Sequence, residues 1–92
     1  MGKYRIALAP KAETDLAQVH KSGDKQAINK IEKLIKELSD HPTIGTGKPE
    51  LLRGVPGIWS RRIDKKNRLV YTIKDDEVLV LVLSALGHYQ DK

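Results

Sequence analysis

The chain has 92 residues, which fits a single domain (residues 1–92) with one modest core, and a partner or a second copy would add stability. It contains no Cys, which excludes disulfides, thiol chemistry and Cys-based zinc sites. Its formal net charge of +5 favours nucleic acid or another acidic partner.

The longest apolar run, Val78–Leu83, is far too short to cross a bilayer. The N-terminal MGKYRIAL lacks the apolar core of a signal peptide. We therefore expect a cytoplasmic protein without membrane contact. Between Gly47 and Lys74, eight Lys and Arg stand against two acids, an excess of +6 that is larger than the +5 of the whole chain. The basic surface should therefore belong to the C-terminal half.

The N-terminal half predicts one strand and two helices. Strand formers fill Tyr4–Leu8. Pro10 is typical of a first helical turn, and Gly23 after Ser22 is typical of a helix C-terminus. Asp24 can cap a second helix over roughly 25–40, whose apolar stripe comprises Ile28, Ile31, Leu34, Ile35 and Leu38. Two helices joined by a short loop predict a hairpin lying on a sheet.

The C-terminal half predicts four strands, over Pro49–Leu52, Ile58–Ile63, Arg68–Lys74 and Glu77–Leu83. The last is almost wholly apolar, as expected of a strand buried on both faces. The order β-α-α-β-β-β-β predicts an α+β fold in which a two-helix hairpin packs on an antiparallel sheet. The other face of the sheet would be open and would carry the basic residues.

The turn between the second and third of these strands leaves two registers open. With Asp64–Asn67 as the turn, Ile63 pairs with Arg68, and Arg62 points to the opposite face from Arg68. If Ile63 joins the turn, or a bulge is present, Arg62 pairs with Arg68 on one face. The other face is then lined by Trp59, Arg61, Leu69, Tyr71 and Ile73. A phosphate site that uses both Arg62 and Arg68 prefers this second register.

The residue types in this half are those needed to cleave RNA without a metal or other cofactor. RNA carries its own nucleophile, the 2′-hydroxyl, and needs a base, a cation at the phosphate and an acid for the leaving oxygen. A carboxylate, several guanidinium groups and an imidazole are available in Glu50, Arg53, Arg61, Arg62, Arg68 and His88.

The residues alone allow other interpretations. A glutamate among arginines is usually a surface ion pair, and an imidazole near a terminus is usually exposed and inert. Strand alternation also means that Arg61 and Arg62 cannot both face one site.

Four segments match one family in order and in near-identical spacing: Lys48-Pro49-Glu50, Trp59–Ile63, Arg68–Tyr71 and His88-Tyr89. Together they resemble the YoeB/Txe branch of the RelE-type toxins. The likeness covers nearly the whole chain and is strongest from Gly45 to Ile73. It implies a microbial-RNase-like RelE fold. It also implies the toxin of a type II toxin–antitoxin pair, an endoribonuclease that cuts messenger RNA in the ribosomal A site.

The resemblance also implies roles for residues. Glu50 corresponds to the general base and His88 to the general acid, while Arg62 and Arg68 correspond to the phosphate-binding arginines. Tyr89 corresponds to the terminal tyrosine of the site. Further cations expected to bind substrate are Lys48, Arg53 and Arg61, of which Arg53 replaces a frequent lysine. The chain departs from some relatives at Leu86, where they have arginine, and it continues past Tyr89.

The partners implied are the ribosome with its messenger and an acidic antitoxin of the YefM/Phd-like kind. Such an antitoxin would neutralise the arginines and cover the open face. Toxins of this branch also tend to pair as homodimers.

Two other functions stay open. A ParE-like inhibitor of DNA gyrase shares the β-α-α-β order but is not expected to keep Glu50 with His88-Tyr89. A basic RNA-binding module without catalysis would tolerate Glu50→Ala and His88→Ala.

Overall fold

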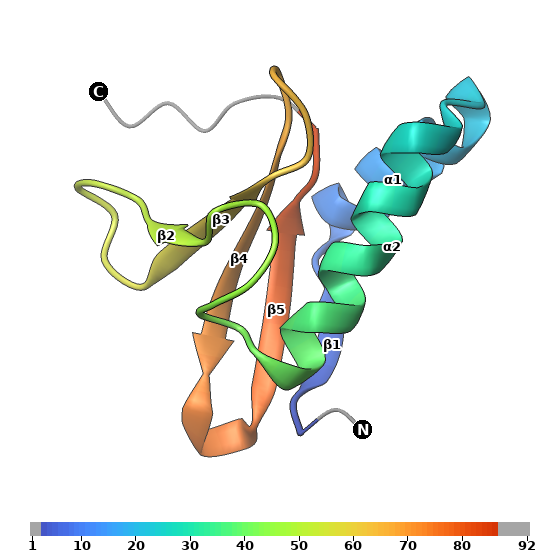
Figure 1. The fold of residues 1–92 in the computed structure, drawn as a ribbon. Coiled ribbons are helices and arrows are strands. Elements are labelled where there is room, and N and C mark those ends of the chain that lie inside the picture. The colour runs from blue at the N-terminus through green and yellow to red at the C-terminus, as the bar shows by residue number, and fades with distance from the viewer. Residues whose placement is uncertain (1–2, 87–92) are drawn as a thin grey trace.

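The computed structural model describes residues 3–86 and has the element order predicted from the sequence (Figure 1). The predicted pair of helices packed on a sheet is confirmed. Its elements are β1 (Arg5–Leu8), α1 (Pro10–Ser22), α2 (Lys25–Asp40), β2 (Glu50–Leu51), β3 (Ile58–Arg62), β4 (Arg68–Lys74), the 3-10 turn η1 (Asp75–Glu77) and β5 (Leu79–Ser84).

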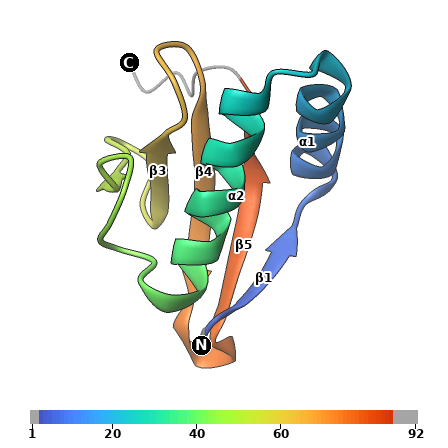
Figure 2. The ribbon, with the colours of Figure 1, turned by 45° about the vertical axis from the view of Figure 1, so that its right-hand side comes forward.

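The five strands form one sheet in the order β1-β5-β4-β3-β2, with both helices on one face (Figure 2). Three strand pairs are antiparallel, but β1 and β5 run parallel, from Arg5 opposite Leu79 to Leu8 opposite Val82. The sheet is therefore mixed, whereas the sequence predicted an antiparallel one. Parallel neighbours need a long connection, and the whole chain from α1 to β4 lies between these two strands.

Local signals set the helix bounds. Pro10 opens α1, and Gly23 ends it with φ 73° and an N–H that donates to the His20 carbonyl at 3.3 Å. The Asp24 carboxylate accepts the Ala27 N–H at 3.1 Å and caps α2. These bounds agree with those predicted from the sequence.

The core lies between the helix pair and the sheet. Its fully buried side chains include Ala12, Leu34, Leu38, Leu69, Tyr71, Val80, Val82 and Ala85. In β5 these inward residues alternate with half-buried Leu79, Leu81 and Leu83, so the second face of that strand is less covered than predicted. Among residues 3–86 no helix is long and apolar enough to span a bilayer.

Candidate active site on the open face of the sheet

The pairing of β3 with β4 places Arg62 directly opposite Arg68. The Ile63 N–H donates to the Asn67 carbonyl at 2.9 Å, so Ile63 belongs to the turn. This is the second of the two registers that the sequence left open. Residues directly opposite one another in an antiparallel pair lie on the same face. Arg62 and Arg68 therefore share the face that the helices leave uncovered.

Glu50 lies on this same face. The short strand β2 pairs Glu50 with Ser60, and Ser60 alternates with Arg61 so that it shares the face of Arg62. Arg68 Nη1 is 3.5 Å from Glu50 Oε1 and 3.3 Å from Ser60 Oγ. The side chains of Glu50 and Arg68 are 59% and 29% exposed. The carboxylate is thus accessible from solvent while it lies beside a cation.

This arrangement has the properties of a phosphate-binding site with a base beside it. An accessible carboxylate can accept a proton, and two guanidinium groups on one surface can each donate two parallel hydrogen bonds to a phosphate. The Glu50–Arg68 pair is long and exposed, so it contributes less than about 1 kcal/mol to stability. An incoming phosphate can therefore displace it at little cost.

Two further predicted cations flank β2 along the chain. Lys48 lies two residues before Glu50, and Arg53 follows directly after the buried Leu52. Both are exposed. Lys48 also has φ 53°, an uncommon conformation for a residue other than glycine. The two cations extend the positive charge along the edge of the sheet where β2 lies.

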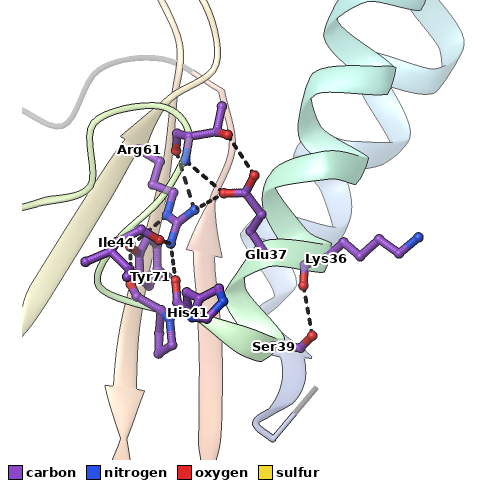
Figure 3. A network of polar contacts seen from close by, with 9 residues as sticks. Lys36, Glu37, Ser39, His41, Ile44, Arg61 and Tyr71 are labelled. Atoms are coloured by element: carbon purple, nitrogen blue, oxygen red, sulfur yellow. Dashed lines mark hydrogen bonds and ion pairs between the residues drawn. The ribbon is translucent and has the colours of Figure 1, made fainter. Parts of the chain in front are cut away.

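Arg61 does not belong to this group, and its prediction as a substrate-binding residue is wrong. It is fully buried on the face covered by the helices, with its side chain 0% exposed. Its guanidinium donates to the Glu37 carboxylate and to backbone carbonyls of the loop after α2 (Figure 3). Strand alternation is the reason, because Arg62 occupies the open face and its neighbour must point inward.

Two residues of this region were missed by the sequence analysis. Ser60 lies between Glu50 and Arg68, and the strand alternation that places Arg62 outward would have placed Ser60 beside it. Glu37 is the carboxylate partner of buried Arg61. An arginine on the covered face of a strand needs such a partner, and Glu37 precedes the buried Leu38 on α2.

His88 and Tyr89 lie outside the described residues. The last described residues, Ala85 and Leu86, donate their N–H groups to Asp15 Oδ2 at 2.9 and 3.2 Å. Burial acts to raise the pKa of Asp15, but these N–H groups and the Lys11 ammonium at 2.7 Å outweigh it and lower that pKa. Leu86 is half-buried and packs against the core.

Comparison with known proteins identifies the family. A family model described as "YoeB-like toxin of bacterial type II toxin-antitoxin system" matches residues 10–89. Toxin YoeB of Synechocystis sp. is 46% identical over 68 residues, which are 73% of this chain and 77% of that toxin.

Two solved structures from Staphylococcus aureus also match. The YoeB dimer has a TM-score of 0.78 at 34% identity, covering 95% of this chain and 99% of its own. The YoeB-YefM complex has a TM-score of 0.75 at 33% identity, and the match covers 94% of this chain and 98% of the matched chain. The chain therefore belongs to the YoeB-like toxins of bacterial type II toxin–antitoxin systems.

Proposed function

We propose that this chain is a ribosome-dependent endoribonuclease that cleaves messenger RNA in the A site without a metal. The observation that carries the proposal is the placement of Glu50, Arg62 and Arg68 on one open face, with Glu50 Oε1 3.5 Å from Arg68 Nη1. A base beside two phosphate-binding cations is what 2′-hydroxyl attack on a phosphate requires.

The proposed reaction uses these three groups together with His88. Glu50 removes the proton of the 2′-hydroxyl, whose oxygen attacks the adjacent phosphorus. Arg62 and Arg68 stabilise the negative charge that develops on the phosphoryl oxygens. His88 donates a proton to the departing 5′-oxygen. The products are a 2′,3′-cyclic phosphate and a 5′-hydroxyl end, and each acid–base group contributes about 10²–10⁴-fold.

The remaining cations and Tyr89 bind the substrate. Lys48 and Arg53 are exposed on either side of β2 and contact RNA phosphates next to the cleaved bond. Tyr89 stacks on a base beside that bond, since aromatic side chains bind unpaired bases in this way.

The partners of this chain are the ribosome with its messenger in the cytoplasm and an acidic antitoxin. The S. aureus relative forms a complex with YefM, and another structure of it is a dimer. An acidic segment of a YefM-like antitoxin would cover the arginines of the open face. Two copies of this chain also associate as a homodimer.

The decisive experiment combines purified ribosomes, a defined messenger and this protein, with primer extension to map the cuts. Glu50→Gln and His88→Gln are compared with Glu77→Gln, which changes an exposed carboxylate in the turn η1. We expect cleavage only with ribosomes, slowed by about 10²-fold or more in the first two variants and unchanged in the third.

Two outcomes would contradict parts of this proposal. Cleavage that survives both Glu50→Gln and His88→Gln would keep the activity but refute the assigned base and acid. No cleavage by the unchanged protein would refute the nuclease. Inhibition of DNA supercoiling by gyrase would then be measured, because a gyrase-binding toxin is the alternative for this fold.

A further inference from the structure

We propose that a network of Glu37, Thr46, Arg61 and Tyr71 around the buried Arg61 guanidinium, here named the Arg61 network, positions Glu50 for proton abstraction. The inference rests on the proposed function, since it assigns positioning residues to that reaction. None of the four lies on the open face with the substrate-binding cations. They act through the backbone of the loop between α2 and β2.

That loop, residues 41–49, contains neither helix nor strand. The loop contains Lys48 and leads directly into β2, which begins with Glu50 at the edge of the sheet. The strand that follows is only two residues long, so few strand hydrogen bonds are available to fix Glu50. The position of Glu50 relative to Arg68 therefore depends on how the loop itself is held.

Every N–H group of the Arg61 side chain has an acceptor, and most of these acceptors belong to the loop. A guanidinium has five N–H donors. In Arg61 these face five acceptors, which are the Tyr71 hydroxyl at 3.2 Å, Glu37 Oε1 at 2.9 Å and the carbonyls of His41, Ile44 (2.8 Å) and Thr46 (3.4 Å). Three of the five are loop carbonyls, so one side chain fixes the loop at three points (Figure 3). A lysine has three donors and cannot make this set of contacts.

Glu37 and Tyr71 complete the network. Glu37 accepts the Thr46 N–H at 2.8 Å and the Thr46 hydroxyl at 2.7 Å, and it neutralises the buried Arg61. The Thr46 hydroxyl, together with the Thr46 N–H and the Arg61 charge, outweighs burial and lowers the pKa of Glu37. Tyr71 donates its hydroxyl to the Pro42 carbonyl at 2.7 Å. The Glu37 carboxylate thus stays ionised, and the loop is bound at Pro42 and at Thr46.

The loop is also joined to the strand that carries the site. The Arg62 N–H donates to the Gly47 carbonyl at 2.7 Å, three residues before Glu50. Arg61 and Arg62 are consecutive in β3, so the residue that holds the loop is bonded to the residue that binds phosphate. Because a misplacement of about 1 Å can cost about 10²-fold in rate, a loosened loop should slow catalysis even when the substrate still binds.

The test uses the whole chain and separates positioning from binding and from stability. Single-turnover cleavage of ribosome-bound messenger is measured at increasing protein concentration, which gives a maximal rate and a half-saturating concentration. The variants are Glu37→Gln and Thr46→Val, with Thr46→Ser as the conservative replacement that keeps the hydroxyl. Ser39→Ala is the matched control, because that hydroxyl of α2 donates to the Lys36 carbonyl of its own helix and not to the loop.

We expect Glu37→Gln and Thr46→Val to lower the maximal rate by about 10–100-fold with an unchanged half-saturating concentration. Thr46→Ser should restore the rate, and Ser39→Ala should leave it unchanged. Amide hydrogen exchange of the folded variants should become faster within residues 43–50. An unchanged maximal rate, or a loss that appears only in the half-saturating concentration, would overturn the proposal.

A failure of the proposed nuclease function would be distinguishable from a failure of the positioning role. If the unchanged protein does not cleave, the proposed function falls, and hydrogen exchange alone decides whether the network holds the loop. Faster exchange at residues 43–50 in Glu37→Gln would support that role. Exchange equal to that of the unchanged protein would overturn it.

Discussion

Arg61 and Arg62 are consecutive in β3 and lie on opposite faces of the sheet. Arg61 is 0% exposed and makes five hydrogen bonds within the protein, whereas Arg62 is exposed and lies opposite Arg68. Two identical side chains therefore have different tasks. One holds a loop in place, and the other is available to a phosphate.

Replacing each of these arginines by methionine should separate the two tasks. Arg61→Met removes the cation that neutralises Glu37 and leaves the loop carbonyls that it binds without its N–H donors. It should lower the free energy of unfolding by about 2–4 kcal/mol. Arg62→Met removes an exposed charge and should change it by less than about 0.5 kcal/mol. Urea unfolding measures both values. Equal losses of unfolding free energy in the two variants would contradict the burial of Arg61. If Arg61→Met does not fold while Arg62→Met does, that result would agree with the burial.

Gly47 should tolerate substitution less well than Gly54. Both have positive φ, 85° and 75°, which costs about 1–2 kcal/mol for a residue with a Cβ. At Gly47 that Cβ would also lie 2.9 Å from the Arg62 carbonyl oxygen, whereas at Gly54 nothing lies within 4 Å. Gly47→Ala should therefore be more destabilising in thermal unfolding and should slow cleavage, because it displaces the loop before Glu50. Equal melting temperatures for Gly47→Ala and Gly54→Ala would contradict the expected clash between a Cβ at position 47 and the Arg62 carbonyl oxygen.

Asp15 should make stability depend on pH in the acid range. Its pKa is lowered in the folded state because the N–H groups of Ala85 and Leu86 and the Lys11 ammonium outweigh the effect of burial. A lowered pKa means that the stabilisation is complete above the unfolded-state value of about 4 and is lost as the pH falls through the folded-state value.

Comparison of the unchanged protein with Asp15→Asn tests this dependence. The difference in free energy of unfolding should be constant near neutral pH and should shrink below about pH 4. Asp15→Ala, which leaves two N–H groups without an acceptor, should cost about 2–3 kcal/mol at pH 7. If the difference in unfolding free energy between the unchanged protein and Asp15→Asn grows as the pH falls, the pKa of Asp15 is not lowered by folding.

Tyr71 should contribute a second dependence, at alkaline pH. Burial raises the pKa of Tyr71, and the neighbouring Arg61 only partly offsets it. A raised pKa means that the stabilisation is complete below the unfolded-state value of about 10 and is lost as the pH rises through the folded-state value. Tyr71→Phe should therefore be less stable at pH 8 by about 1–2 kcal/mol, since two hydrogen bonds are lost.

The check for Tyr71 is urea unfolding of both proteins from pH 8 to above pH 10. The gap between the unchanged protein and Tyr71→Phe should narrow as the pH rises. A gap that stays constant would show that Tyr71 does not ionise on unfolding in this range.

The sequence by itself determined the element order, the helix bounds and the family. Pro10, Gly23 and Asp24 act within one or two turns of the chain, so their effects can be read from neighbouring residues. Alternation along the strands likewise predicted an open face that carries Arg62 or Arg68. The resemblance to YoeB toxins rested on motifs whose spacing is visible in the sequence.

Only the tertiary structure decided the parallel pairing of β1 with β5, the register that joins Arg62 to Arg68, and the burial of Arg61. Each depends on contacts between residues far apart in the chain. The turn after β3 is compatible with two registers, and they differ in which side chains reach the helices. The structure has the register in which Glu37 of α2 neutralises Arg61, because a buried guanidinium is tolerated only where a carboxylate and enough acceptors surround it.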